Sequence, residues 1–415
     1  MTDEAMEVRD ASAGYALQAD RPMVPEGYRD TEIGIIPEDW EVSAVRQKGE
    51  VLAGKALAVN APGEQRPYLR TKNVLDGRID TADVLKMPMT DEQFRQFQIR
   101  NGDVLLNEGQ SLGLVGRCAI YKDEYPEPCA IQNALLRFRA RSGICENFAA
   151  YLFRHCQQTG IFSRISLQTT SVAHLGSTRF GRLRLAWPTE VEQRAIATAL
   201  SDADELLETL DRLIAKKRDI KQATMQQLLT GETRLPGFVG EWEEKEFDEV
   251  LERINGKRHQ VQASDYQSIG IYPVIDQGKE AVVGFSDASD RLFECPYGGV
   301  IIFGDHTCIV KFVNYDFIIG ADGTQVVKAK KGQITRFYAY CLQYSGVEQT
   351  GYNRHFKHLR DKRFVVPSGE EQIAIASALS ALDNEIEALE KRRAKTVALK
   401  QAMMQELLTG RTRLI

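Results

Sequence analysis

The chain has 415 residues, enough for two or three domains with separate cores. Its hydrophobic share of 43% and charged share of 27% are ordinary for a globular protein, and no apolar run approaches the length of a membrane span. The formal net charge of −5 does not by itself indicate a nucleic-acid partner. The seven cysteines form no Cys-x-x-Cys pair, which is typical of reduced thiols and predicts a cytoplasmic location.

The N-terminal residues 1–26 are acidic and rich in small residues, with neither a basic start nor an apolar centre. We therefore expect a loose tail and no signal peptide. Residues 27–47 then form a lead-in with a turn and an anchoring Trp40. A similar lead-in containing Trp242 follows residue 235, so each half of the chain reads as lead-in, globular segment and helix.

Both globular segments are predicted to be mixed α and β. Short apolar runs between Gly, Asn and Asp turns predict strands, and each segment continues with a helix and one last short strand. The predicted strands cover residues 66–75, 102–110, 112–121, 134–140 and 182–188 in the first segment and 271–276, 281–285, 298–304, 308–313, 317–322, 324–330 and 362–367 in the second, with helices at Asn147–Thr159 and Ile334–Tyr344.

One long stretch occurs twice. Pro188–Leu235 and Pro367–Leu414 align without a gap at a spacing of 179 residues, with roughly half of the positions identical. Each copy opens at a proline, runs about 40 residues in strong helix formers, and reaches a glycine (Gly231 or Gly410). Each copy therefore predicts one long helix.

The apolar residues of the first copy recur at alternating spacings of four and three, as in Ile196, Leu200, Ala203 and Leu207. This narrow stripe is the coiled-coil pattern. A helix of about 40 residues is about 60 Å long and cannot bury its stripe inside a small domain. We expect the two copies to pair antiparallel, as in a two-fold dimer. The alternative is two separate helices, each packed on its own domain.

Two basic stretches immediately precede the repeated helices. Residues 147–189 contain five arginines and no acidic residue, and residues 325–366 contain nine Lys and Arg against one Glu and one Asp. A charge run is usually a solvated face. Because the two stretches occupy equivalent places in a duplicated chain, we interpret them as surfaces for the DNA backbone.

Sequence motifs for catalysis are missing. The chain has no Gly-Lys-Ser/Thr phosphate loop and no Pro-Pro pair for an adenine-methylation motif, and His355-x-x-His358 lacks the spacing of a zinc site. We predict no catalytic, cofactor-binding or metal-binding residue. An enzyme with an unrecognised active site is the alternative that activity of the isolated chain would reveal.

Several segments together resemble the specificity (S) subunit of type I restriction-modification systems, from about Tyr28 onward. In the first half these are IGIIPEDWEV (33–42), RTKNV (70–74), GDVLLN (102–107), EQRAIATALSDAD (192–204) and KQATMQQLLTGETRLPGF (221–238); in the second they are GYNRHFKHL (351–359), EQIAIASALSALD (371–383) and KQAMMQELLTGRTRL (400–414). The acidic tail before Tyr28 departs from the family pattern.

The resemblance implies an α+β protein with pseudo-two-fold symmetry, in which two target-recognition domains are joined by two long antiparallel coiled-coil helices. The expected parts are an N-terminal tail at 1–26, a first recognition domain at 27–187, a central helix at 188–235, a second recognition domain at 236–366 and a C-terminal helix at 367–415. We call the two recognition domains head 1 and head 2.

The resemblance also implies partners. These are double-stranded DNA, two methylation (M) subunits that use S-adenosylmethionine, and restriction (R) subunits that use ATP and magnesium. The heads diverge in sequence, so each is expected to read a different half of a bipartite site. The runner-up interpretation is a freestanding DNA-binding regulator with a coiled-coil spacer and no methylation partner.

Polar residues in the loops beside the basic charges are the candidates for DNA contact, because base edges are read by polar side chains and phosphates by Lys and Arg. In head 1 these are Arg164, Gln168, Thr169, Thr170, Ser171, Arg179 and Arg182; in head 2 they are Tyr352, Asn353, Arg354, His355, Lys357 and Arg360. For partner binding on the helices we select Lys217, Lys221, Lys395 and Lys400, although such positions can be merely solvated.

Overall fold

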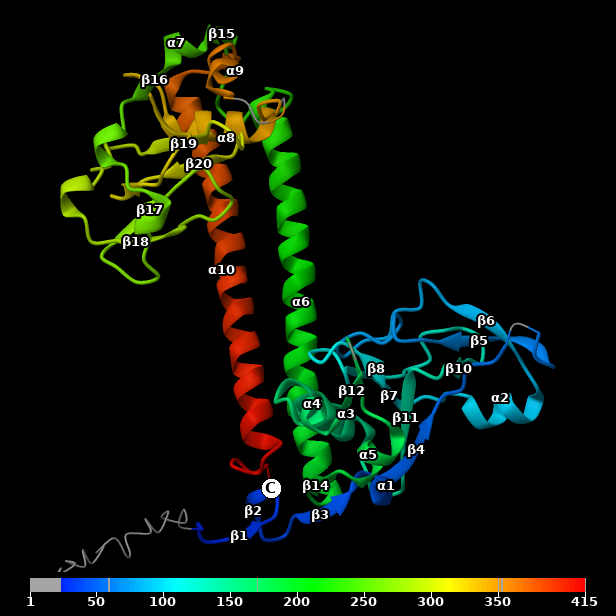
Figure 1. The fold of residues 1–415 in the computed structure, drawn as a ribbon. Helices are drawn as coiled ribbons and strands as arrows, with labels where there is room; N and C mark the ends of the chain where they lie inside the picture. Colours follow the sequence, from blue (N-terminus) through cyan, green and yellow to red (C-terminus); the bar gives the residue numbers. More distant parts are fainter. Residues whose placement is uncertain (1–23, 59, 170, 350, 352–353, 415) are drawn as a thin grey trace, which may run out of the picture. The chain divides into compact units, whose positions relative to one another are not determined.

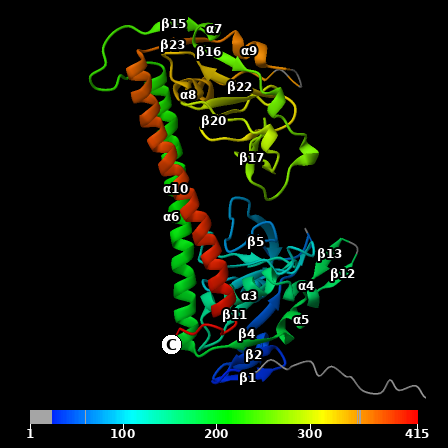
Figure 2. The ribbon, with the colours of Figure 1, turned by 90° about the vertical axis from the view of Figure 1, so that its left-hand side faces the viewer.

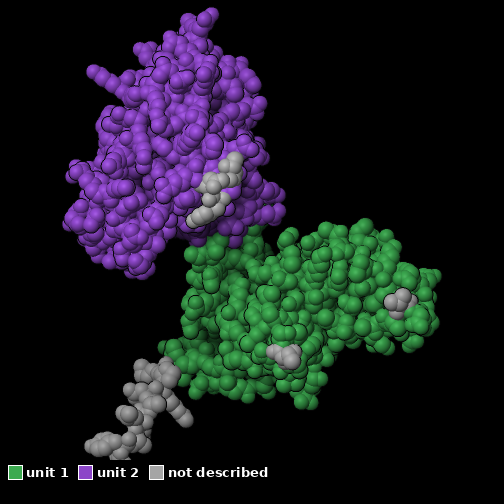
Figure 3. Space-filling view, turned by 45° about the horizontal axis from the view of Figure 1, so that its top comes forward, with its two compact units in different colours: residues 1–206, 396–415 green, residues 207–395 purple. Residues whose placement is uncertain are grey.

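The computed structural model describes residues 24–58, 60–169, 171–349, 351 and 354–414. The chain divides into two compact units, unit 1 (Met1–Leu206 with Thr396–Ile415) and unit 2 (Leu207–Lys395) (Figure 3). The helix α6 (Glu190–Leu229) and the helix α10 (Gly369–Leu407) are each divided between the two units, so that each unit contains one segment of both helices. The long helices predicted for the two repeated stretches are thus confirmed.

Head 1 lies in unit 1 and is built from short strands and helices that precede α6 (Figure 1). Its elements are β1 (Tyr28–Thr31), β2 (Gly34–Pro37), β3 (Glu41–Ala44), α1 (Val45–Lys48), β4 (Gly49–Ala53), β5 (Glu64–Leu69), β6 (Leu85–Met89), α2 (Asp91–Phe97), β7 (Val104–Asn107), β8 (Gly109–Gln110), β9 (Cys118–Ile120), β10 (Ala130–Ile131), β11 (Leu135–Ala140), α3 (Glu146–Gln158), α4 (Ile161–Ile165), β12 (Leu167–Thr169), β13 (Val172–His174), α5 (Ser177–Arg182) and β14 (Arg184–Trp187).

Head 2 lies in unit 2, between α6 and α10 in the sequence. Its elements are β15 (Glu243–Glu246), α7 (Phe247–Val250), β16 (Leu251–Ile254), the 3₁₀ turns η1 (Lys257–His259), η2 (Ala263–Asp265) and η3 (Ser289–Arg291), β17 (Tyr272–Ile275), β18 (Gly284–Ser286), β19 (Val300–Gly304), β20 (Val310–Val313), β21 (Ile318–Ile319), β22 (Thr324–Ala329), α8 (Thr335–Ser345), α9 (Phe356–Arg360) and β23 (Arg363–Val366).

The two heads share one strand connectivity. The sheet ordered β4-β11-β7-β9 in head 1 corresponds to β16-β22-β19-β20 in head 2, and β10-β5-β6 corresponds to β21-β17-β18. In both heads the last strand before the long helix pairs antiparallel with the lead-in strand, as β14 with β3 and β23 with β15. The mixed α/β heads and their duplication are therefore confirmed. The sheet β12-β13-β8 belongs to head 1 only, among the strands that the structure describes.

Each unit has a core in which one head meets segments of both long helices. In unit 1, Ile196 and Leu200 at the start of α6 pack with Leu407 near the end of α10 and with Trp40 and Phe148 of head 1. In unit 2, Ile375 and Leu379 of α10 pack in the same way with Leu228 of α6 and the aromatic residues of head 2. The apolar stripe of each helix thus packs against both a head and the other helix, so the alternative of two separate helices, each packed only on its own domain, is excluded.

Ion pairs between the helices establish their direction. In unit 1, Asp204 of α6 binds Lys400 of α10. In unit 2, residue numbers rise along α6 as they fall along α10, from Asp211 with Arg393 to Lys217 with Glu385 and Lys221 with Asp383. Figures 1 and 2 show the two helices side by side within each unit. The predicted antiparallel pairing is confirmed.

An arginine near the end of each repeated stretch binds a buried glutamate near the start of the other stretch, and we call each of these Arg–Glu pairs a clamp. In unit 1, the Arg413 guanidinium donates from Nε and Nη2 to both carboxylate oxygens of Glu192, at 2.7 and 2.9 Å, and lies over the Trp40 ring at 5.9 Å. Trp40 Nε1 also donates to Glu192 at 2.9 Å. In unit 2, Arg234 binds Glu371 at 2.6 Å through both donors and lies over Trp242 at 5.4 Å.

A second duplicated network holds each head on the helix pair. In unit 1, the Tyr151 hydroxyl donates to Asp204 at 2.8 Å, and Lys400 binds the same carboxylate. In unit 2, Tyr340 donates to Asp383 at 2.6 Å, and Lys221 binds that carboxylate at 2.6 Å. Asp204 and Asp383 are 179 residues apart, as are Lys221 and Lys400. The repeat therefore reproduces side-chain contacts as well as helices.

Arg413→Ala is predicted to destabilise unit 1 strongly, because Glu192 is 2% exposed and would keep an unpaired buried charge. Breaking a buried ion pair on one side costs about 3–5 kcal/mol. Arg194→Ala is the matched control, since Arg194 forms an exposed pair with Glu190 one helical turn away, and exposed pairs of this kind contribute little to stability. Urea unfolding of both variants measures the difference, and equal losses would contradict a structural clamp.

Candidate nucleic-acid interface

The polar residues selected in head 1 lie on a two-stranded antiparallel ribbon. Strands β12 and β13 pair from Leu167↔His174 to Thr169↔Val172 (Figure 2). Gln168 and Thr169 on β12 and Ser171 in the turn are exposed, and Thr170 lies outside the described residues. The major groove of B-DNA is about 12 Å wide and admits such a ribbon.

The three arginines of head 1 that were selected for DNA contact differ in their surroundings. Arg179 is half-buried and donates to the backbone carbonyls of Leu175 and His174, at 3.1 and 2.7 Å, so it fixes the exit from the ribbon. Arg164 on α4 and Arg182 on α5 are exposed. Arg164 also donates to the backbone carbonyl of Thr159, at 3.2 Å. As exposed side chains, Arg164 and Arg182 are suited to phosphate contact.

In head 2 the selected residues gather at the start of α9. Arg354 and Lys357 are exposed, whereas His355 is completely buried. Its ring Nδ1 lies 3.0 Å from the carbonyl oxygen of Asp305. In this position His355 supports the segment from inside the head. Tyr352 and Asn353 lie outside the described residues.

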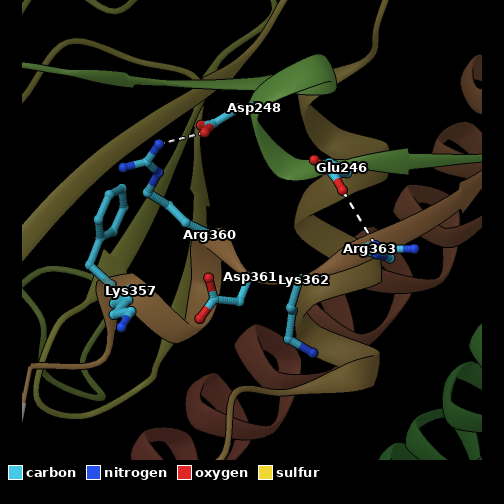
Figure 4. Close-up of a pocket in the computed structure, with 8 residues that line it drawn as sticks. Glu246, Asp248, Lys357, Arg360, Asp361, Lys362 and Arg363 are labelled. Carbon is cyan, nitrogen blue, oxygen red and sulfur yellow. Dashed lines mark hydrogen bonds and ion pairs between the residues drawn. The ribbon is translucent and has the colours of Figure 1, made fainter.

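A depression of about 610 Å³ beside α9 combines charges of both signs (Figure 4). Its cations are Lys357, Arg360, Lys362 and Arg363, and its carboxylates are Glu246, Asp248 and Asp361. Arg360 binds Asp248 at 2.5 Å, and Arg363 lies 3.4 Å from Glu246. The hydrogen bond from the Arg360 guanidinium holds the pKa of Asp248 below its ordinary value.

Pairing within this depression removes Arg360 from the residues best placed for DNA. Lys362 Nζ donates to the Ser345 hydroxyl at 3.0 Å, and burial lowers the pKa of this lysine. The positive charge that α9 offers to a phosphate is consequently concentrated at Lys357, with Arg354 just before the helix.

Three of the four lysines selected for partner binding instead connect the two long helices. Lys217 binds Glu385 at 2.5 Å, Lys221 binds Asp383, and Lys400 binds Asp204. Burial lowers the pKa of Lys400, although its hydrogen bond with Asp204 opposes that effect. Lys395 is exposed. Of the four selected lysines, Lys395 is therefore best suited to a partner.

Two acidic residues that follow central strands were not selected in the sequence analysis, although each contacts a candidate DNA-binding segment. Glu108 follows β7 and lies 3.2 Å from the ring of His174 on the ribbon, and Asp305 follows β19 and binds the start of α9. Glu108 and Asp305 occupy equivalent positions after the central strands, and this equivalence becomes visible only when the strands of the two heads are matched. Leu167 and Val172, which flank the polar tip of the ribbon, are exposed apolar residues and were also not selected in the sequence analysis.

In the parts of the chain that the structure describes, no group of three or more His, Cys, Asp or Glu side chains is arranged to hold a metal ion. Among the described helices, none combines the length and the apolar character that crossing a membrane requires.

A family model matches the chain twice, once in each half. The model, described as type I restriction modification DNA specificity domain, covers residues 37–216 and 240–398. The chain belongs to the type I restriction-modification specificity (S) subunit family. It is the DNA specificity subunit of such a system, a non-catalytic component of the complex.

Relatives of this S subunit agree over nearly its whole length. A Methanocaldococcus jannaschii protein provisionally named as the specificity subunit of the type I restriction enzyme MjaX is 28% identical over 94% of this chain and 97% of its own. The specificity subunit of MjaVIII from the same organism is 23% identical over 91% and 94%. The recognised family thus spans both heads and both helices.

Solved structures match the fold. The S subunit from M. genitalium superposes with a TM-score of 0.60 at 15% identity, covering 89% of this chain and 96% of that one. A chain from a structure titled for complex assembly and conformational transition of the type I system gives a TM-score of 0.54 at 17% identity, covering 90% and 99%. Both likenesses concern the fold alone.

Lys357→Ala is predicted to weaken binding to all DNA sequences and to lower the slope of log affinity against log salt by about 0.9, the effect of one lost phosphate contact. Fluorescence anisotropy from 50 to 200 mM salt measures this slope. The charge-neutral control Asp248→Ala/Arg360→Ala should leave the slope unchanged, because those side chains already neutralise each other. A larger slope change in the control than in Lys357→Ala would exclude this assignment.

Proposed function

We propose that each head of this S subunit reads one half of an asymmetric, bipartite DNA site. The proposal is supported by one observation: the two heads share the same strand connectivity but expose different elements on it. Head 1 presents the β12–β13 ribbon, and head 2 presents the start of α9 with Lys357. Identical heads would suit a palindrome, whereas heads with different surfaces suit two different half-sites.

The paired helices support a fixed spacing between the half-sites. The helices α6 and α10 contain 40 and 39 residues, about 60 Å each, and both continue from one unit into the other. Ion pairs and the buried clamps hold the helix register within each unit. A stiff connection of this kind would leave a constant number of unread base pairs between two readers.

We further propose that two methylation subunits bind the exposed faces of the helices, one for each copy of the repeat, with restriction subunits joining them. The exposed Lys395 is the remaining candidate contact for them. S-adenosylmethionine, ATP and magnesium would be bound by these partners. Family membership favours this role over that of a freestanding regulator. The seven free cysteines fit the reducing cytoplasm where such a complex would act.

Mapping of methylated adenines across the host genome tests the bipartite site. We expect methylation at one motif made of two different short sequences separated by a constant number of unspecified base pairs, and loss of that methylation when the gene for this chain is deleted. Restoring the gene provides the control. A palindromic or continuous motif would contradict two dissimilar readers.

Inserting one heptad into each long helix, at residue 207 of α6 and residue 395 of α10, is predicted to lengthen the unread spacer. Seven residues add about 10 Å of helix, which corresponds to about three base pairs at 3.4 Å each. The methylated motif of the variant measures the spacer. Inserting seven residues into the N-terminal tail is the control and should leave the spacer unchanged. An unchanged spacer in the heptad variant would show that the length of the helices does not determine the spacing.

A further inference from the structure

We propose that Glu108 and Asp305 are equivalent positioning residues, each of which holds the recognition segment of its own head at the end of the central strand. The proposal rests on the proposed reading of one half-site by each head. It assigns to two acidic side chains a part in specificity without contact to DNA.

The two residues occupy the same place in the shared connectivity. Glu108 directly follows β7, and Asp305 directly follows β19. The backbone N–H of each donates to a carbonyl in the loop before the next paired strand, from Glu108 to Ala134 at 2.9 Å and from Asp305 to Gly323 at 2.7 Å. Both therefore lie at one fixed point of the central sheet.

The backbone carbonyl of each residue binds the segment that leads into the short helix before the final strand. The N–H of Leu175 donates to Glu108 at 2.9 Å, and the N–H of His355 donates to Asp305 at 2.8 Å. Leu175 lies before α5 and His355 before α9. The same backbone link thus recurs in two heads whose sequences have diverged.

The side-chain carboxylates of Glu108 and Asp305 extend this link to the exposed segment of each head, which is the β12–β13 ribbon in head 1 and the start of α9 in head 2. Glu108 Oε2 lies 3.2 Å from Nδ1 of His174, which ends the β12–β13 ribbon. Asp305 Oδ1 accepts from the N–H of Phe356 at 2.8 Å, and its Oδ2 accepts from Gln325 Nε2 at 3.2 Å. In head 2 the residues next to this anchor are Arg354 and Lys357, whose side chains are exposed.

The burial of these groups indicates an internal role. Asp305 is 3% exposed and His355 is 0% exposed, so neither side chain is presented to a DNA duplex. A carboxylate near phosphates lowers affinity for DNA, and burying one is costly unless it is hydrogen-bonded. Acidic residues at both anchors are explained if the Asp305 carboxylate fixes the backbone at Phe356 and the Glu108 carboxylate fixes the His174 ring, so that neighbouring side chains are held where they reach the bases.

The test measures discrimination by the full-length chain, as competition between the target duplex and duplexes with one base pair changed in either half. Asp305→Ala is expected to reduce discrimination in one half-site and Glu108→Ala in the other, each by about 5- to 150-fold per base pair, the range of a lost bidentate contact. Discrimination in the opposite half should change less than twofold. The salt slope should stay constant, because no phosphate contact is removed.

Two comparisons separate positioning from general destabilisation. Asp305→Asn keeps an oxygen that accepts from the Phe356 N–H and should retain most of the discrimination lost in Asp305→Ala. Glu252→Ala removes an exposed carboxylate of head 2 that pairs with Lys328 at 3.2 Å, and it should leave both half-sites unaffected. If Asp305→Ala fails to fold, the Glu108→Ala result decides, since that side chain is partly exposed and its bond to His174 lies at the surface of the head.

Equal loss in both half-sites, or unchanged discrimination in the folded alanine variants, would overturn the proposal. A wild-type chain that discriminates neither half-site would instead contradict the proposed function itself. The wild-type result therefore distinguishes failure of the anchors from failure of the two-reader model.

Discussion

The structure depends on two buried carboxylates, Glu192 and Glu371, each bound by an arginine from the other copy of the repeat. Each carboxylate is 2% exposed, and such a charge is stable in a protein interior only when it is paired and hydrogen-bonded. Arg413 lies near the end of the chain, and Arg234 lies beyond α6. Neither unit is therefore completed by one copy alone, so each unit of the fold needs residues from both copies of the repeat.

This constraint separates a constant frame from two variable readers. The Arg–Glu clamps, the Asp–Lys pairs and the apolar stripe recur in the two copies of the repeat at a spacing of 179 residues. The heads keep their strand connectivity but present a ribbon in one case and the start of a short helix in the other. Divergence of the exposed segments can change the DNA sequence that is read without disturbing the contacts that hold each head.

The sequence predicted the frame well because its signals are long and periodic. The gapless repeat, the helix formers and the apolar stripe are sufficient for two long helices, and a duplicated unit that pairs with itself indicates the antiparallel direction. Buried strands such as β7 and β19 were also predicted, since their apolar runs are bounded by turn residues. Trp40 was expected to anchor the lead-in, and it is 1% exposed.

The candidate site was harder to predict because distant partners decide which charges remain available. Lys221 and Lys400 were selected as contacts for a partner subunit, but each meets a carboxylate on the opposite long helix. Arg360 is paired with Asp248, which lies 112 positions earlier, and His355 is buried against Asp305. The β12–β13 ribbon has a polar tip without a long alternating pattern, so residues 167–174 resembled a loop.

A chimaera that carries head 1 twice tests the central claim most directly. Residues 40–187 would replace residues 242–366, so that the replacement runs from one clamp tryptophan to the end of the head and both copies of the repeated helix remain. Mapping its methylated sites should reveal a palindromic bipartite motif, in which one half-site of the wild-type motif appears twice around a spacer of constant length. An unchanged asymmetric motif from a folded, assembled chimaera would contradict a common frame that holds two interchangeable readers.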